Sequence, residues 1–250
     1  MLLQNPKAAA AKGETNIMTM TIKEATKNVG GLSKVSKMPS LSWSISALDC
    51  ATGTKLRESN QSTVCDGCYA LKGMQALPTQ QNAYARRLEL WRTNRKLWLL
   101  SMDYLLKNKK EIQDTKYFRW FDSGDIQGAE MFQDIIKLAN LNPSIKFWLP
   151  TKEFKLVKIY ANQIPNNLNV RKSHPLINAY KMQPMNNITE SYVYDEDKLD
   201  TVPSNTKICP ATKPNSNGQC NDCRMCWDKS IKSITYIKHL TIKGGIYIYV

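Results

Sequence analysis

The seven cysteines of this chain fall into two groups that lie far apart in the sequence, and each group contains a Cys-x-x-Cys unit. Such a unit places two thiolates at the ends of a tight turn, where both can face one metal ion or cluster. The second group extends the unit to Cys-x-x-Cys-x-x-Cys, which arranges three thiolates around one loop, as in ferredoxin-type sites. In chain order, the predicted metal ligands are Cys50, Cys65, Cys68, Cys209, Cys220, Cys223 and Cys226.

The cysteine count favours an iron–sulfur centre over zinc. A structural zinc ion takes four ligands, so seven cysteines leave three over unless His174, His239 or an aspartate joins them. Iron–sulfur ligation by four and by three cysteines uses all seven, because a three-cysteine cluster keeps one iron open for substrate. We therefore expect one or two 4Fe-4S clusters, with zinc and a thiol redox role as alternatives. The sequence leaves open whether the two groups share one cluster.

The composition is that of a globular, enzyme-sized chain, with 42% hydrophobic and 22% charged residues. We find no signal-peptide pattern and no apolar run near the ~20 residues that span a bilayer, so we expect a cytoplasmic protein without membrane contact. Reduced thiols in that compartment argue against a disulfide framework. The net charge of +14 favours an anionic partner. Because the basic residues are scattered, we favour an anionic small molecule over nucleic acid.

Three cycles of a strand, a polar turn and a helix begin at Tyr117, Ile145 and Leu168, with a period of about 25 residues. Such cycles predict parallel strands with crossover helices. The expected fold class is α/β, either a partial (β/α) barrel or an open, mostly parallel sheet, with a cysteine-rich C-terminal loop region. A long amphipathic helix is expected over about residues 80–107.

The expected domain organisation is simple. Residues 1–33 have little periodic apolar pattern and predict a flexible N-terminal arm. Residues 34–250 then form a single α/β metal-binding domain. Within it, the Pro-, Asn- and Ser-rich stretch 203–218 is expected to be a loop that delivers the second cysteine group.

The turn after the first of these strands carries candidate site residues, because ligands bind at the carboxyl ends of parallel strands. Asp122 and Asp125 are the candidate catalytic carboxylates, and Ser123 and Gly124 between them are candidates for cofactor binding. The structural alternative is a helix N-cap, which is a common role for Asp and Ser at this position.

The next two strand ends add basic residues. Lys152 is a candidate both for catalysis and for holding a phosphate or carboxylate, with a surface ion pair as the alternative. Arg171 and Ser173 would extend such an anion site. His174 is a candidate proton donor, although a histidine without a visible partner is more often structural.

Several blocks together resemble the phage protein family called gene product eighty-eight, over roughly residues 33–239. These blocks are Lys37-Met-Pro-Ser, Cys65-x-x-Cys68-Tyr-Ala, Phe118-Arg-Trp-x-Asp-Ser-Gly-Asp125, Phe147-Trp-Leu-Pro-Thr-Lys-Glu153, Asn169-Val-Arg171 and the tail from Cys209-Pro to Cys226-Trp227. The resemblance implies a phage origin, a location in the cytoplasm of the infected host, an iron–sulfur centre and an activity that degrades flavin.

The layout is also similar to that of radical S-adenosylmethionine enzymes, in which the turn Ser123-Gly124-Asp125 would contact the cofactor. However, their tight Cys-x-x-x-Cys-x-x-Cys loop is absent, because Cys50 lies well upstream of Cys65. Our main hypothesis is an iron–sulfur oxidoreductase that acts on an anionic small molecule such as a flavin, with an unspecified electron donor. The alternatives are a zinc-stapled nucleic-acid-binding module and a radical enzyme.

Overall fold

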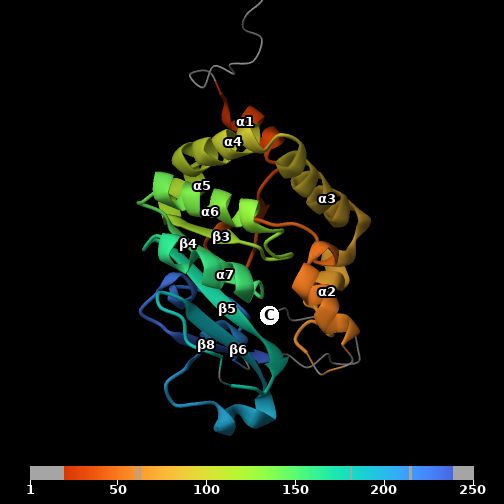
Figure 1. The fold of residues 1–250 in the computed structure, drawn as a ribbon, viewed down its shortest axis with the longest axis vertical. Coiled ribbons are helices and arrows are strands. Elements are labelled where there is room, and N and C mark those ends of the chain that lie inside the picture. The colour runs from red at the N-terminus through yellow and green to blue at the C-terminus, as the bar shows by residue number, and fades with distance from the viewer. Residues whose placement is uncertain (1–19, 60, 62, 181, 214–215, 239–250) are drawn as a thin grey trace, which may run out of the picture.

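The computed structural model describes residues 20–59, 61, 63–180, 182–213 and 216–238 (Figure 1). One eight-stranded sheet runs through them in the order β1-β2-β3-β4-β5-β6-β8-β7. The strands are β1 (Ser33–Lys34), β2 (Leu41–Trp43), β3 (Tyr117–Trp120), β4 (Lys146–Thr151), β5 (Leu168–Ile177), β6 (Thr189–Asp195), β7 (Lys207–Ile208) and β8 (Ser233–Lys238).

The sheet is open and mostly parallel, which confirms the predicted α/β class. Strand β1 pairs antiparallel with β2, and the other neighbouring strands pair parallel. Strands β1 and β7 form the two edges and do not pair with each other in the described part of the chain. Of the two predicted architectures, the open sheet is therefore correct.

Helices connect the central strands, as the strand–turn–helix cycles predict. The helices are α1 (Ile22–Asn28), α2 (Ala51–Glu58), α3 (Pro78–Thr93), α4 (Arg95–Asn108), α5 (Lys110–Thr115), α6 (Ala129–Leu141) and α7 (Phe154–Tyr160). The helix expected over residues 80–107 is divided into α3 and α4 at Asn94. The side chain of Asn94 caps α4 by accepting a hydrogen bond from the Leu97 amide at 3.2 Å.

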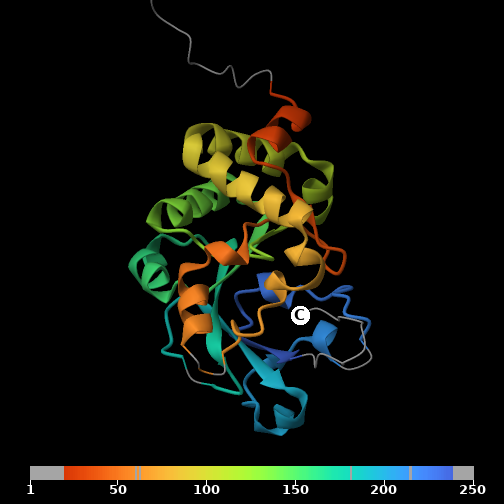
Figure 2. The same ribbon diagram turned by 90° about the vertical axis from the view of Figure 1, so that its right-hand side faces the viewer.

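One face of the sheet packs against helices and holds the apolar core. Trp43 of β2 and Trp120 of β3 are fully buried there with Trp98 of α4. The rings of Trp43 and Trp98 meet edge to face, with centroids 5.1 Å apart. Figure 2 shows the green helices α6 and α7 on one side of the sheet and the blue segment with the second cysteine group on the other.

The opposite face of the sheet carries polar side chains although it is also covered. Ser42, Arg119, Trp148 and Asn169 are successive register partners across β2, β3, β4 and β5, so their side chains share this face. The segment that follows β7 covers it. The short 3-10 helix η8 (Met225–Trp227) contacts both β4 and β5. The cysteine-rich segment therefore lies against a polar, buried surface.

Part of the predicted N-terminal arm is ordered. Residues 1–19 lie outside the described residues, but α1 begins with a capping box between Thr21 and Glu24 and packs against α4. Ala25 and Val29 have no exposed surface. The prediction of an arm over residues 1–33 is thus wrong for residues 20–33. The spacing Thr21-x-x-Glu24 is the sequence signal that marks this helix.

The sequence predicts no membrane-spanning segment, and the structure tests this prediction for helices. In the part of the chain that the structure describes, no helix has both the length and the apolar character needed to cross a bilayer.

Candidate metal centres

The first cysteine group, called here the three-cysteine group, consists of Cys50, Cys65 and Cys68. Cys50 lies at the N-terminus of α2, and the amide of Cys68 donates a hydrogen bond to the carbonyl of Cys65 at 3.2 Å. A β-carbon at Gly53 would lie 3.7 Å from the sulfurs of both Cys50 and Cys65. The missing side chain at Gly53 therefore leaves room beside these two sulfurs.

The second group, called here the four-cysteine group, consists of Cys209, Cys220, Cys223 and Cys226. Each of its cysteines has its backbone held by a hydrogen bond. The Cys223 amide donates to Cys220 at 2.8 Å, the Cys220 amide to Lys37 at 2.9 Å, the Cys209 amide to Thr235 at 2.8 Å, and Asn169 donates to the Cys226 carbonyl at 2.8 Å. These bonds attach the group to β8, to β5 and to the chain before β2.

Electrostatic effects between the thiols show which cysteines lie together. Burial raises the pKa of Cys209 to about 12, and the nearby Cys226, Cys220 and Cys223 contribute to the rise. Burial also raises the pKa of Cys50 far above its usual range, with contributions from Asp125, Cys68 and Cys65. The structure thus arranges the seven cysteines as three and four.

The thiols are gathered but do not yet form a coordination sphere. In the described residues, no three His, Cys, Asp or Glu side chains converge closely enough to hold one ion. Metal binding at either group therefore requires the sulfurs to turn towards a common point and to lose their protons.

Two arginines lie beside the four-cysteine group, Arg171 fully buried and Arg119 half-buried. Arg171 has no exposed surface, and its guanidinium donates to the carbonyls of Glu190 at 2.8 Å and Ile231 at 3.1 Å. Arg119 stacks over Trp148, with its guanidinium carbon 4.4 Å from the ring centroid. Neither arginine has a carboxylate within ion-pair distance among the described residues, and both Nε atoms are buried without a partner there.

The positive charges of Arg171 and Arg119 act to lower the pKa of the Cys226 thiol. Burial raises the pKa of Cys226, whereas Arg171, a hydrogen bond with Tyr236 and Arg119 lower it. The Tyr236 hydroxyl lies 3.3 Å from the Cys226 sulfur. Positive charge and a hydroxyl thus favour negative charge on this sulfur. The arrangement suits an anionic metal–thiolate centre, because a buried arginine keeps its charge and needs an anionic neighbour.

Arg119 also connects the two groups. Burial raises the pKa of Tyr69, the residue after Cys68, and the charge and hydrogen bonding of Arg119 oppose that rise. Arg119 therefore contacts Tyr69 on one side, and on the other side its charge interacts with the Cys226 thiol. The sequence analysis missed Arg119, Tyr69 and Tyr236. The signal for Arg119 was a charged residue between two large apolar residues, Phe118 and Trp120, in a buried strand.

The predicted turn after β3 lies close to the three-cysteine group. Asp125 is 7% exposed, and its carboxylate accepts hydrogen bonds from the Thr151 hydroxyl at 2.6 Å and from the amides of Lys152 and Ile126 at 2.8 Å. Burial raises the pKa of Asp125 to about 6. This carboxyl also contributes to the raised pKa of Cys50, so the two side chains are neighbours.

Asp122 and Ser123 have different neighbours from those of Asp125. The Asp122 carboxylate accepts hydrogen bonds from the hydroxyls of Ser42 and Ser44, and the Tyr69 hydroxyl donates to the Asp122 main-chain carbonyl. The Ser123 hydroxyl is buried without a hydrogen-bond partner in the described part of the chain. The turn thus ties β2 and the residue after Cys68 to the carboxyl end of β3.

Gly124 provides a test of this turn. Its φ of +86° is unfavourable for other residues, and an added β-carbon would lie 2.9 Å from the Ile45 carbonyl oxygen. We expect Gly124→Ala to lower the free energy of unfolding by about 2–4 kcal/mol, measured by urea denaturation. Gly67→Ala is the matched control, since a β-carbon there meets nothing within 4 Å. Equal effects of the two substitutions would contradict this description of the turn.

The basic residues that were predicted to form one anion site are divided between the two groups. The positive charge of Lys152 acts to lower the pKa of Cys65 and that of His174. Lys152 therefore lies at the three-cysteine group. Arg171 instead lies at the four-cysteine group. Ser173 accepts a long hydrogen bond of 3.4 Å from the Ser191 hydroxyl.

His174 is mostly enclosed. It is 8% exposed and stacks on Tyr192, with ring centroids 5.5 Å apart. Its Nδ1 lies 3.1 Å from the Leu176 amide nitrogen. Burial lowers the pKa of His174, which favours the neutral ring at physiological pH.

Fold and site together define an α/β protein with an open parallel sheet and two cysteine groups, one beyond the carboxyl ends of the strands and one on the polar sheet face. The chain belongs to the Gene product 88 family, whose model matches residues 5–229. This confirms the family resemblance of the sequence motifs, and the match includes all seven cysteines and α1. Comparisons with curated proteins and with solved structures gave no match.

Proposed function

We propose that this protein is an iron–sulfur oxidoreductase that acts on an anionic small molecule in the cytoplasm of the infected host. One 4Fe-4S cluster would be held by the four-cysteine group and a second by the three-cysteine group. A flavin is the first substrate to test, because the motif resemblance suggests it.

The observation that carries the proposal is the pair of arginines beside four cysteines, of which Arg171 is fully buried and Arg119 half-buried. Burying a guanidinium without an ion-paired carboxylate is costly, and neither arginine has one in the described part of the chain. Asp122 acts on Arg119, and Asp228 and Glu190 act on Arg171, from beyond ion-pair distance. A cluster bound by four thiolates carries net negative charge, which would compensate these two cations. Hydrogen bonds and charge around the sulfurs are also the means by which proteins adjust cluster potentials.

Iron–sulfur ligation fits the three-cysteine group better than zinc does. Zinc would need a fourth ligand, and Asp125 is the nearby carboxylate. Both oxygens of Asp125 already accept hydrogen bonds, from Thr151 and Ile126 on one oxygen and from Lys152 on the other. This carboxylate is therefore poorly available as a ligand. Three thiolates with an open position match a cluster that binds substrate at its fourth iron.

The protein residues around the three-cysteine group would bind and protonate the substrate. A bound cluster would supply or accept the electrons. Lys152 offers an ammonium group to the anionic part of the substrate, and His174 is a neutral neighbour on the same side. Asp125 lies beside Cys50, and because burial raises its pKa to about 6, it is suited to hold a proton near the reacting atoms.

The proposal is tested by the absorption spectrum of the protein purified without oxygen. We expect a brown protein with a broad band near ~400 nm that bleaches on reduction with dithionite. A colourless protein with stoichiometric zinc would replace the proposal with the zinc-stapled alternative. In that case, nucleic-acid affinity that falls steeply with salt would indicate its partner.

A further inference from the structure

Exposed lysines gather at the edge of the sheet where the parallel strands begin, at the opposite end from the three-cysteine group. Lys116 immediately precedes β3, Lys146 is the first residue of β4, and Lys232 immediately precedes β8. All three side chains are exposed. Because β3 to β6 and β8 pair parallel, their first residues lie along one edge. The amide of Lys146 donates to the Lys116 carbonyl at 2.8 Å, which places these two side by side.

The segment after the four-cysteine group adds two more cations to this edge. Arg224 and Lys146 line the same surface pocket. Burial lowers the pKa of Lys229 to about 8, and the charge of Lys232 contributes, so these two ammonium groups are neighbours. We call the five residues the basic edge. They are Lys116, Lys146, Arg224, Lys229 and Lys232.

Acidic residues offset the charge of the basic edge only in part. Asp228 is exposed among these cations, and its pKa is lowered by hydrogen bonds with Ser230 and by the charge of Lys146. Asp114, near the end of α5, is already ion-paired with Lys110 at 2.7 Å. The basic edge therefore keeps a net positive charge, which attracts an acidic partner.

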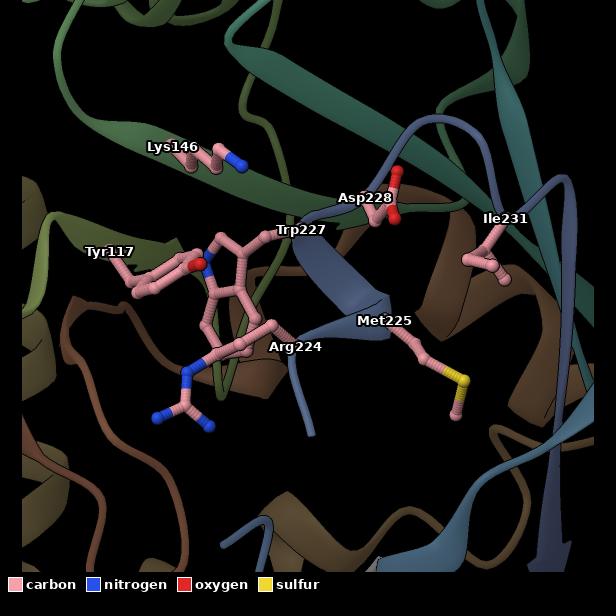
Figure 3. Close-up of a pocket in the computed structure, with 7 residues that line it drawn as sticks. All are labelled: Tyr117, Lys146, Arg224, Met225, Trp227, Asp228 and Ile231. Atoms are coloured by element: carbon pink, nitrogen blue, oxygen red, sulfur yellow. The ribbon is translucent and has the colours of Figure 1, made fainter. Parts of the chain in front are cut away.

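The basic edge adjoins the four-cysteine group. Arg224 donates from Nη1 to the Cys223 carbonyl at 2.9 Å. Trp227 immediately follows the last cysteine of the group, and its ring meets that of Tyr117 edge to face, with centroids 5.3 Å apart. Figure 3 shows Lys146 on one side of this aromatic pair and the Arg224 guanidinium on the other. A molecule bound to the basic edge therefore lies beside the four-cysteine group.

The exposed chemistry of this edge is charge rather than aromatic stacking. The Arg224 guanidinium carbon lies 5.5 Å from the Tyr117 ring centroid, and the ring of Trp148 packs against that of Trp227 with centroids 5.3 Å apart. Neighbouring side chains thus occupy the two rings. Proteins that bind single-stranded nucleic acid combine basic grooves with free ring faces. This edge fits an acidic protein surface better.

We propose that the basic edge is the docking surface for a small acidic protein that delivers one electron to the four-cysteine group. The inference rests on the proposed function and supplies its electron donor. Four cysteine ligands leave no iron open for substrate, so a cluster there would only exchange electrons. The carrier is oxidised by one electron and the cluster is reduced by one, with no bond made or broken. Redox partners of this kind use small, polar interfaces that form quickly and separate readily.

Reduction of the full protein by reduced plant-type ferredoxin, an acidic carrier with one 2Fe-2S centre, tests the proposal. Rapid-freeze electron paramagnetic resonance follows loss of the carrier signal and growth of the 4Fe-4S signal. The rate constant should fall steeply as salt is added, because charge steers the association. The double variant Lys146→Glu with Lys232→Glu should lower it about tenfold at low salt. The matched control is Lys155→Glu with Lys158→Glu, two exposed positions on α7, which should change it about twofold or less.

Dithionite, which needs no docking surface, separates this proposal from the proposed function. A colourless protein that dithionite does not bleach would remove both. A brown protein that dithionite reduces but ferredoxin does not would overturn the docking surface alone, as would equal losses in the two double variants. Duplex DNA provides a further arm. DNA binding that is lost in Lys146→Glu with Lys232→Glu, while the ferredoxin rate stays unchanged, would assign the basic edge to nucleic acid and overturn the proposal.

Discussion

Replacing Arg171 with methionine should lower the free energy of unfolding by about 3–5 kcal/mol in the protein purified with its metal. The substitution removes the donor to the main-chain carbonyls of Glu190, Ile231 and Met225. It also removes a positive charge that favours the anionic form of Cys226. Chemical denaturation under anaerobic conditions, followed by circular dichroism, measures the change.

Arg92→Met is the control for the Arg171 substitution. Arg92 is exposed in α3 and makes one long hydrogen bond of 3.4 Å to Gln127, so its loss should change stability by about 0.5 kcal/mol or less. If Arg171→Met is neutral or stabilising, the buried guanidinium does not compensate an anionic centre. The main support for the proposed four-cysteine cluster would then be lost.

Cys50→Ser and Cys223→Ser should each remove about half of the iron, because each breaks one of two separate clusters. The structure groups Cys50 with Cys65 and Cys68, and groups Cys223 with the remaining three cysteines. Iron analysis of the two variants and of the double variant checks this division. The double variant should retain little iron.

The two cysteine variants serve as controls for each other, since they make the same chemical change in different groups. Loss of all iron in either single variant would mean that both groups share one cluster. Iron that is unchanged in both would contradict the assignment of these cysteines as ligands.

The general fold followed from the sequence because its signals are local. The apolar runs that begin at Tyr117, Ile145 and Leu168, each followed by a polar turn, predicted β3, β4 and β5 and their parallel pairing. The start of α1 was missed because a helix of seven residues contains too few periodic positions to stand out. Its capping box was the better signal.

The candidate site was only partly accessible from the sequence. Cysteine spacing identified the groups, but the neighbours of each group depend on which strand lies beside which. Arg171 was assigned to a strand-end anion site with Lys152, whereas the alternation of side chains in β5 directs it to the sheet face that the C-terminal segment covers. Contacts such as Arg119 with Tyr69 join distant parts of the chain, so no local pattern predicts them.

The central claim is that the two cysteine groups hold two iron–sulfur clusters. Its most direct test is chemical analysis of iron, acid-labile sulfide and zinc in the unmodified protein purified without oxygen. The account predicts iron and sulfide in nearly equal amounts, sufficient for two clusters in each chain, and little zinc. Stoichiometric zinc without labile sulfide would contradict it.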